Sequence, residues 1–178
     1  TVEHALATLL AEVFAAPGFR PYASDDVRGV QIGGALKNVL AIAAGIVKGR
    51  ELGASAHAAL TTRALAELIR VGTADGGRRE TLTGLSGLGD LLLTATNPQS
   101  RNFAFGEALG RGTATVAGAL RSGPLVEGVA TAPIALTRAR RLEVDTPSME
   151  AVAAVLDDRL TIDEALDALL RRALKREA

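Results

Sequence analysis

Lys37 is the first residue of this sequence that could do chemistry, because it stands in a small and otherwise apolar stretch. On a helix it shares its face with Gly33, Gly34 and Ala41. Neighbours of that size allow another helix or a ligand to approach the lysine stem closely. Two interpretations stay open at this point: an ammonium that acts on a ligand, or a lysine that extends from a tight helix crossing into water.

A second candidate cluster lies in the segment 84–102. Asp90 and Thr94 are four residues apart and would share one face of a helix, while the leucines 91–93 between them are expected to point largely into a core. An acid in this position is either a helix cap or a buried charge that needs a partner. The glycines before it run G-x-x-G-x-G, the reverse of the dinucleotide motif, and no strand precedes them, so we exclude a nucleotide loop.

The triplet Ser100, Arg101 and Asn102 is expected to open the next helix. A serine cap leaves backbone N–H groups exposed, and arginine and asparagine add donors that suit a phosphate or a carboxylate. An ordinary helix cap is the competing interpretation. For such a triplet alone the ordinary cap is the more common case, and the short distance in sequence to Asp90 and Thr94 strengthens the interpretation as an anion site.

The elements that position these residues are predicted to be helices, since Ala, Leu and Gly dominate the apolar content and alternating β-branched runs are scarce. The one expected strand is a short one at 19–22. Arg63, Glu67 and Arg70 are expected to form a solvated row of charges on the second long helix. The predicted helices cover 3–15, 30–48, 54–74, a short stretch ending at 82, 101–109, 126–142, a helix starting at Pro147 after Thr146, and one starting with a capping box at Thr161 and Glu164.

Composition excludes several classes of function. Twenty basic residues balance twenty acidic ones and aromatics make up 3%, so neither a long-range field nor stacking platforms favour nucleic acid. Without cysteine and with two histidines, the sequence offers no disulfide framework and poor material for a metal site. No charge-free apolar run approaches the roughly 18 residues of a membrane span. We expect a cytoplasmic protein without membrane insertion.

Three blocks of the sequence carry a family resemblance: GVQIGGALKN (29–38), GLSGLGDLLLTATNPQSRNFAFGEALGRG (84–112) and LVEGVATA (125–132). Together they are similar to the NAD(P)-dependent glycerol-3-phosphate dehydrogenases of the bacterial type. The resemblance implies an all-α, multi-helix substrate domain at 26–178, like the C-terminal domain of 6-phosphogluconate dehydrogenase-type enzymes. It also implies that 1–25 is a helix-strand remnant of a Rossmann domain.

The same resemblance implies a role for each candidate residue. Lys37 would be the general acid and base that protonates the carbonyl oxygen of dihydroxyacetone phosphate, Asp90 would orient its ammonium, and Thr94 would bring a hydroxyl near the substrate. These three are the implied catalytic residues. Substrate contacts are implied for Lys37, Asp90, Ser100, Arg101 and Asn102, and cofactor contacts for Arg101, Leu125 and Glu127.

The strand–GxGxxG–helix unit that binds a dinucleotide is not found in the 178 residues. NADH or NADPH is therefore expected to bind mainly to an absent N-terminal domain, without a metal, and this chain alone is predicted to be inactive. The implied whole is a homodimer that interconverts dihydroxyacetone phosphate and sn-glycerol 3-phosphate for glycerophospholipid synthesis. The alternatives are a helical domain of another β-hydroxyacid or sugar-phosphate dehydrogenase, and a non-catalytic dimerisation module with its contact at Gly33, Gly34 and Ala41.

Overall fold

The computed structural model describes residues 3–122 and 125–172, and these residues form helices with no strand. The predicted all-helical fold is confirmed. In chain order the elements are α1 His4–Phe14, α2 Val27–Gly49, α3 Gly53–Ala74, α4 Arg79–Thr83, the π-helix η1 Leu85–Gly89, α5 Asp90–Thr96, α6 Arg101–Gly110, α7 Val116–Ser122, α8 Glu127–Arg141, α9 Pro147–Leu156 and α10 Ile162–Leu170.

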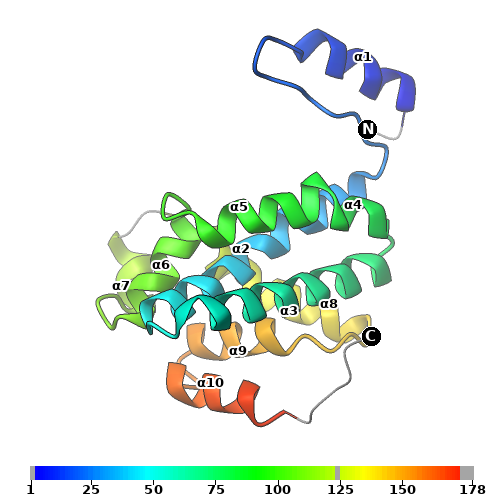
Figure 1. Cartoon of the computed structure of the whole chain (residues 1–178). Coiled ribbons are helices and arrows are strands. Elements are labelled where there is room, and N and C mark those ends of the chain that lie inside the picture. The colour runs from blue at the N-terminus through cyan, green and yellow to red at the C-terminus, as the bar shows by residue number, and fades with distance from the viewer. Residues whose placement is uncertain (1–2, 123–124, 173–178) are drawn as a thin grey trace.

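Helix α2 runs through the middle of the domain, with other helices packed around it (Figure 1). It contacts α3, α5, α6, α8 and α9, and every residue from 38 to 47 is buried. A helix that is apolar on all sides must be enclosed in this way. Lys37 and Asn38, at the start of this buried stretch, are consequently held by a helix that is packed on all sides.

By length and composition alone, α2 could also cross a membrane, with a mean hydropathy of 1.6 over its most apolar window. However, 67% of that window is buried inside the domain. Burial by neighbouring helices explains the apolar sequence of α2, so we interpret it as a core helix.

The α2–α6 crossing depends on glycines in both helices. A Cβ on Gly45 would lie 2.1 Å from the carbonyl oxygen of Phe103, and one on Gly106 would lie 2.2 Å from the carbonyl oxygen of Ile42. Without side chains at these positions, the two backbones can touch. The crossing brings the start of α6, and with it Asn102, next to α2.

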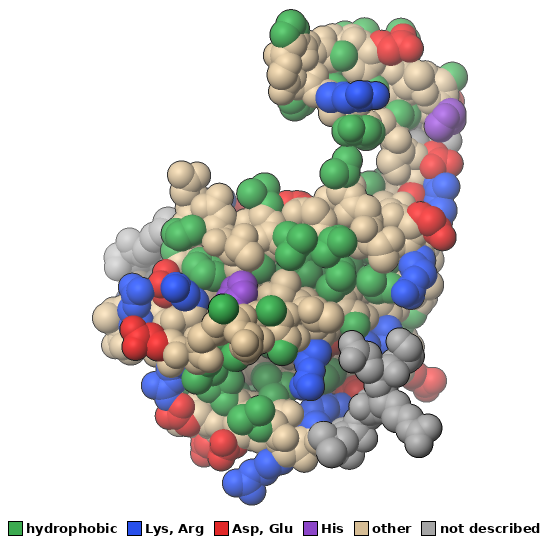
Figure 2. Space-filling model, in the orientation of Figure 1, with side chains coloured by type: hydrophobic (Ala, Val, Ile, Leu, Met, Phe, Trp, Pro, Cys, Tyr) green, Lys and Arg blue, Asp and Glu red, His purple; other side chains and the backbone are tan. Residues whose placement is uncertain are grey.

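Residues 3–25, which we call the arm, stand away from the helical domain (Figure 1). The predicted strand at 19–22 is wrong: Phe19 makes a single bridge to Ala16, and the rest of the segment is irregular. A strand needs a neighbouring strand to pair with, and the described residues contain none. Figure 2 shows hydrophobic side chains on the arm. The large ones, each more than 40% exposed, are Leu6, Leu9, Leu10, Val13, Phe14, Phe19 and Tyr22.

The predicted row of solvated charges on α3 is wrong at one position. Glu67 is only 1% exposed, and its carboxylate accepts hydrogen bonds from the backbone N–H groups of Ser148 at 2.8 Å and Met149 at 3.2 Å. These groups lie in the first turn of α9, where N–H groups have no partner within the helix. Glu67 therefore caps α9, whereas Thr146 at the N-cap position makes no side-chain cap bond.

The helix starts predicted from capping residues are otherwise confirmed. Pro147 is the first residue of α9, and Thr161 with Glu164 forms a reciprocal capping box at α10. Helix α2 begins at Val27, three residues before the predicted start, with Asp26 as its N-cap. The π-helix η1 and the helix α7 were not predicted, although the start of α7 has a signal in Thr115, whose hydroxyl accepts a bond from the N–H of Gly118 at 3.0 Å.

Candidate functional site

Two segments far apart in the sequence meet at an ion pair. Nζ of Lys37, in α2, donates to Oδ2 of Asp90, the first residue of α5, at 2.5 Å, across 53 residues of sequence. The side chains are 21% and 32% exposed, so the pair is open to a ligand on one side while the stems are packed. The family resemblance implied that both residues belong to one site, and the structure brings them together.

The π-helix η1 places Asp90 at this distance from Lys37. A Cβ on Gly33 would lie 2.4 Å from the carbonyl oxygen of Ser86, and one on Gly87 would lie 1.9 Å from the carbonyl oxygen of Leu82. Both glycines therefore allow η1 to lie directly on its neighbours, one of which is α2. Wider π-turns often occur at functional sites, and here the turn ends where Asp90 begins α5.

Thr94 lies one turn after Asp90 on the same face of α5, as its spacing predicted. Its hydroxyl donates to the carbonyl oxygen of Asp90 at 2.6 Å, and the residue is 9% exposed. The hydroxyl proton is thus used within the helix, and the oxygen keeps its lone pairs as acceptors. Of the three leucines between them, Leu91 alone is buried, and Leu92 and Leu93 face solvent, so the expectation that all three point into the core is wrong.

A buried amide network joins α2, α6 and α8 beside the ion pair. Nδ2 of Asn102 donates to Oδ1 of Asn38 at 3.0 Å, and Oδ1 of Asn102 accepts from the N–H of Gly128 at 2.8 Å. Nδ2 of Asn38 donates to Oε2 of Glu127 at 3.1 Å. Asn38 was not predicted as a site residue, although its place directly after Lys37 was a usable signal.

The predicted triplet lies at the start of α6. Ser100 caps the helix through a bond from the N–H of Phe103 at 3.3 Å, as predicted. Arg101 pairs with Glu127 at 3.3 Å, and both side chains are about half exposed. Leu125 is exposed just before α8. It belongs to this region because it lies two residues before Glu127 in the sequence.

The small-residue face around Lys37 is largely used inside the domain. Gly33 packs against η1, and Ala41 is fully buried. A second copy of the chain cannot reach these two positions. Two of the three positions expected to form the contact of a non-catalytic dimerisation module are therefore unavailable, and Gly34 alone stays open.

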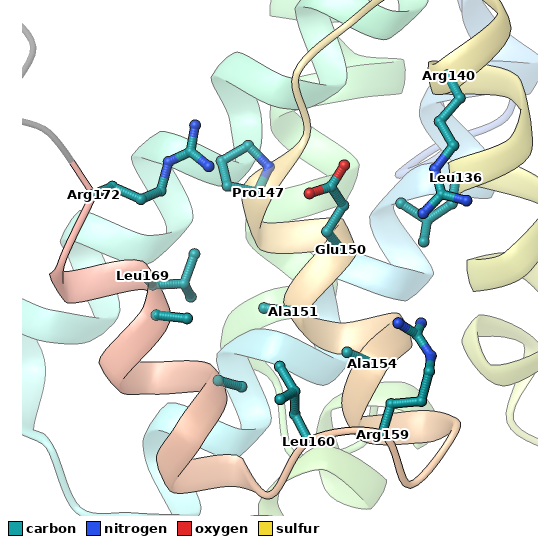
Figure 3. A pocket seen from close by; sticks show the side chains of 12 residues that line it. Leu136, Arg140, Pro147, Glu150, Ala151, Ala154, Arg159, Leu160, Leu169 and Arg172 are labelled. Atoms are coloured by element: carbon teal, nitrogen blue, oxygen red, sulfur yellow. The ribbon is translucent and has the colours of Figure 1, made fainter.

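A separate groove of about 290 Å³ lies between α8, α9 and α10 (Figure 3). Four charged residues stand on its walls, and none of the predicted site residues lines it. Arg159 pairs with Asp157 and Arg172 with Asp145, so two of its three arginines are already neutralised. The groove is distinct from the Lys37–Asp90 site.

Comparison with known proteins gives one consistent result. Residues 26–167 match the family model described as NAD-dependent glycerol-3-phosphate dehydrogenase C-terminus. A curated relative from Bradyrhizobium sp. (strain BTAi1), named glycerol-3-phosphate dehydrogenase (NAD(P)+), is 59% identical over 98% of this chain and 52% of its own length. A relative of the same name from Brucella ovis is 56% identical over 94% of this chain and 50% of its own length.

Solved structures agree. The crystal structure of glycerol-3-phosphate dehydrogenase from Coxiella burnetii is 40% identical, with a TM-score of 0.88 over 96% of this chain and 52% of that one. The enzyme from Saccharomyces cerevisiae is 27% identical, with a TM-score of 0.79 over 90% of this chain and 47% of that one. The chain spans about half the length of the relatives it matches. It therefore belongs to the NAD-dependent glycerol-3-phosphate dehydrogenase family and corresponds to the C-terminal part of its members.

Proposed function

We propose that this chain is the substrate half of an NAD(P)-dependent glycerol-3-phosphate dehydrogenase, which interconverts dihydroxyacetone phosphate and sn-glycerol 3-phosphate for glycerophospholipid synthesis. The observation that carries the proposal is the partly buried Lys37–Asp90 pair beside the amide and arginine cluster at the start of α6. One arrangement thus offers a proton donor and, close by, donors for a phosphate.

In this proposal Lys37 handles the proton of the reaction. Its ammonium donates a proton to the carbonyl oxygen of dihydroxyacetone phosphate, and in the reverse direction the neutral amine takes the hydroxyl proton of sn-glycerol 3-phosphate. Asp90 accepts a hydrogen bond from Nζ, which fixes the direction of the remaining ammonium protons. Thr94 supports this geometry from the next turn of α5 through its bond to the Asp90 backbone.

The phosphate would bind at the start of α6. Arg101 has five donors and can contact a phosphate while one of them stays with Glu127. The hydroxyl of Ser100 accepts the cap bond and keeps its own proton to donate. Asn102 uses one proton of its amide for Asn38, which leaves the second for the ligand. The partial positive charge of the helix start adds to these donors.

This chain supplies only part of the cofactor contacts. Arg101 and Glu127 are exposed beside the amide network and Leu125 precedes them on the surface, so this edge can receive one end of a dinucleotide. When bound, NADH or NADPH supplies the hydride. We further propose that residues 1–25 belong to the nucleotide-binding domain, with which the exposed apolar side chains of the arm would pack, and that the whole enzyme is a cytoplasmic homodimer.

The test uses a fusion in which this chain follows the N-terminal half of the Bradyrhizobium relative. With Lys37→Ala, we expect turnover of dihydroxyacetone phosphate to fall by about 10²- to 10⁴-fold, the usual contribution of a general acid, while NADH binding stays nearly unchanged. Steady-state NADH oxidation and a fluorescence titration measure the two effects. A near-normal kcat in this variant would refute the role of Lys37.

Two controls complete the test. The 178-residue chain alone is expected to oxidise no NADH, because most nucleotide contacts lie elsewhere; measurable oxidation would contradict this. Comparing phosphate-bearing with carboxylate substrates on the fusion separates the proposed enzyme from other β-hydroxyacid dehydrogenases, since Arg101 and the start of α6 are expected to select phosphate.

A further inference from the structure

Two adjacent glycines in α2 have different surroundings. A Cβ on Gly33 would lie 2.4 Å from the carbonyl oxygen of Ser86, so packing against η1 explains this glycine. A Cβ on Gly34 would meet no atom within 4 Å, and Gly34 is not among the residues with positive φ. Glycine inside a helix is less favourable than alanine, so Gly34 weakens α2 without a reason in the packing or the backbone of the described residues.

The open space at Gly34 adjoins the candidate site. Gly34 precedes Lys37 by three residues and Asn38 by four, so the three share one face of α2. The carbonyl oxygen of Gly34 also accepts a long bond from Nδ2 of Asn38 at 3.4 Å. The missing side chain would therefore stand directly beside the proton donor and the amide network.

The order of groups along α2 indicates what fills this space. Asn38 contacts Asn102 at the start of α6, where the proposed function places the phosphate. Lys37 comes next and meets the carbonyl oxygen, and Gly34 lies about 6 Å from Asn38 toward the start of the helix, by the rise of 1.5 Å per residue. A three-carbon substrate held by its phosphate at one end and its carbonyl at Lys37 points its other end toward Gly34.

We propose that Gly34 is a substrate-contacting residue whose bare Cα leaves room for the hydroxymethyl end of dihydroxyacetone phosphate. This inference rests on the proposed function. In this role Gly34 sets the size of the site at the end opposite the phosphate. Substrate binding then explains why α2 contains a glycine that lowers the stability of the helix.

The test is Gly34→Ala in the fusion enzyme described above. One added methyl group in a site that fits its substrate changes recognition by about 10- to 200-fold, so we expect KM for dihydroxyacetone phosphate to rise at least about tenfold. KM for NADH and the inhibition constant of inorganic phosphate are expected to stay unchanged, because neither ligand occupies this space. In the 178-residue chain the same substitution should raise Tm by about 2–4 °C, since it removes a helix glycine.

A matched control is available in the next residue. Ala35 is exposed and lies about 200° around α2 from Lys37. Ala35→Gly makes the reverse change on the opposite face, and it should lower Tm by a similar amount with KM unaffected. Should the fusion fail to fold, NMR titration of the 178-residue chain with sn-glycerol 3-phosphate and with inorganic phosphate makes the same comparison: Gly34→Ala should weaken the first and not the second.

Several results would overturn the inference. An unchanged KM for dihydroxyacetone phosphate means that the substrate does not contact Gly34, and a rise confined to the KM of NADH means that the nicotinamide end lies there instead. A lower Tm for Gly34→Ala means that packing, and not a ligand, requires the glycine. Absence of dehydrogenase activity in the folded, unsubstituted fusion would instead overturn the proposed function itself, and the role of Gly34 with it.

Discussion

Replacing Glu67 by alanine is the sharpest test of how this domain is held together. The carboxylate belongs to α3 but bonds to two backbone N–H groups in the first turn of α9, those of Ser148 and Met149. All three residues are at most 3% exposed, so water does not compensate for the loss. Glu67→Ala therefore leaves two buried donors without their acceptor.

The magnitude follows from these contacts. A buried donor left without a partner costs about 1–3 kcal/mol, or about 2–6 kcal/mol for two. Part of this is offset, because burial raises the pKa of Glu67 despite the bonds from Ser148 and Met149, which means that the ionised carboxylate is itself disfavoured. We expect a loss of about 2–4 kcal/mol in the free energy of unfolding, or about 4–16 °C in Tm for a domain of this size.

The pH dependence gives a second, independent check. A carboxyl whose pKa is higher in the folded protein binds more protons when folded, so its contribution to stability is greatest below the ordinary Glu pKa of about 4.3 and declines as the pH rises through the folded value. Glu67→Gln cannot titrate and keeps one acceptor. The stability of the unsubstituted protein relative to Glu67→Gln should therefore fall as the pH rises above about 4.3.

Urea unfolding followed by circular dichroism, at several pH values, measures both effects. The exposed neighbour Arg63 supplies the control, because Arg63→Ala on the outer face of α3 should change stability by less than about 0.5 kcal/mol. A loss below 1 kcal/mol for Glu67→Ala, or a relative stability that rises with pH, would refute the assignment of Glu67 as a buried cap.

Two further predictions concern the elements that carry the site. Asp26→Ala removes the acceptor of the N–H groups of Gly29 and Arg78 and should lower the free energy of unfolding by about 1–3 kcal/mol. Burial raises the pKa of Asp26, but its hydrogen bonds lower it overall, so this stabilisation is present above about pH 3.9 and is lost on further acidification. An acid titration in urea that shows no such loss would contradict this prediction. Leu91→Ala should cost about 2–5 kcal/mol because the side chain is fully buried, whereas Leu93→Ala, at 62% exposed, should stay within about 0.5 kcal/mol; equal losses in thermal unfolding would contradict the observed orientation of α5.

Much of the fold could be predicted, because the start of a helix is set largely by capping residues that are close to it in the sequence. The capping box at Thr161 and the proline at Pro147 are local, and the structure confirms both. The π-helix η1 could not be predicted, because it depends on packing against the distant helix α2, where a Cβ on Gly33 would lie 2.4 Å from the carbonyl oxygen of Ser86. The strand at 19–22 failed for a related reason, since pairing requires a partner strand that the described residues do not contain.

The error at Glu67 was avoidable in part. Counting residues by three and four joined it to Arg63 and Arg70, but at 100° per residue it lies only about 20° from Leu60, which belongs to the apolar face. The position of Glu67 on the helix therefore indicates burial, although a charged residue is usually exposed. What no local pattern could supply was the partner, the start of α9, which is about eighty residues further along the chain.

The two ion pairs of the candidate site differ in a way that suits one half of a shared active site. Lys37 and Asp90 are 2.5 Å apart, are at most one-third exposed, and come from elements packed against the core. Arg101 and Glu127 are 3.3 Å apart and about half exposed, and pairs of that kind contribute only about 0–1 kcal/mol. Under the proposed function, a phosphate would therefore recruit Arg101 at little cost, while Asp90 would hold the ammonium that is proposed to handle the proton.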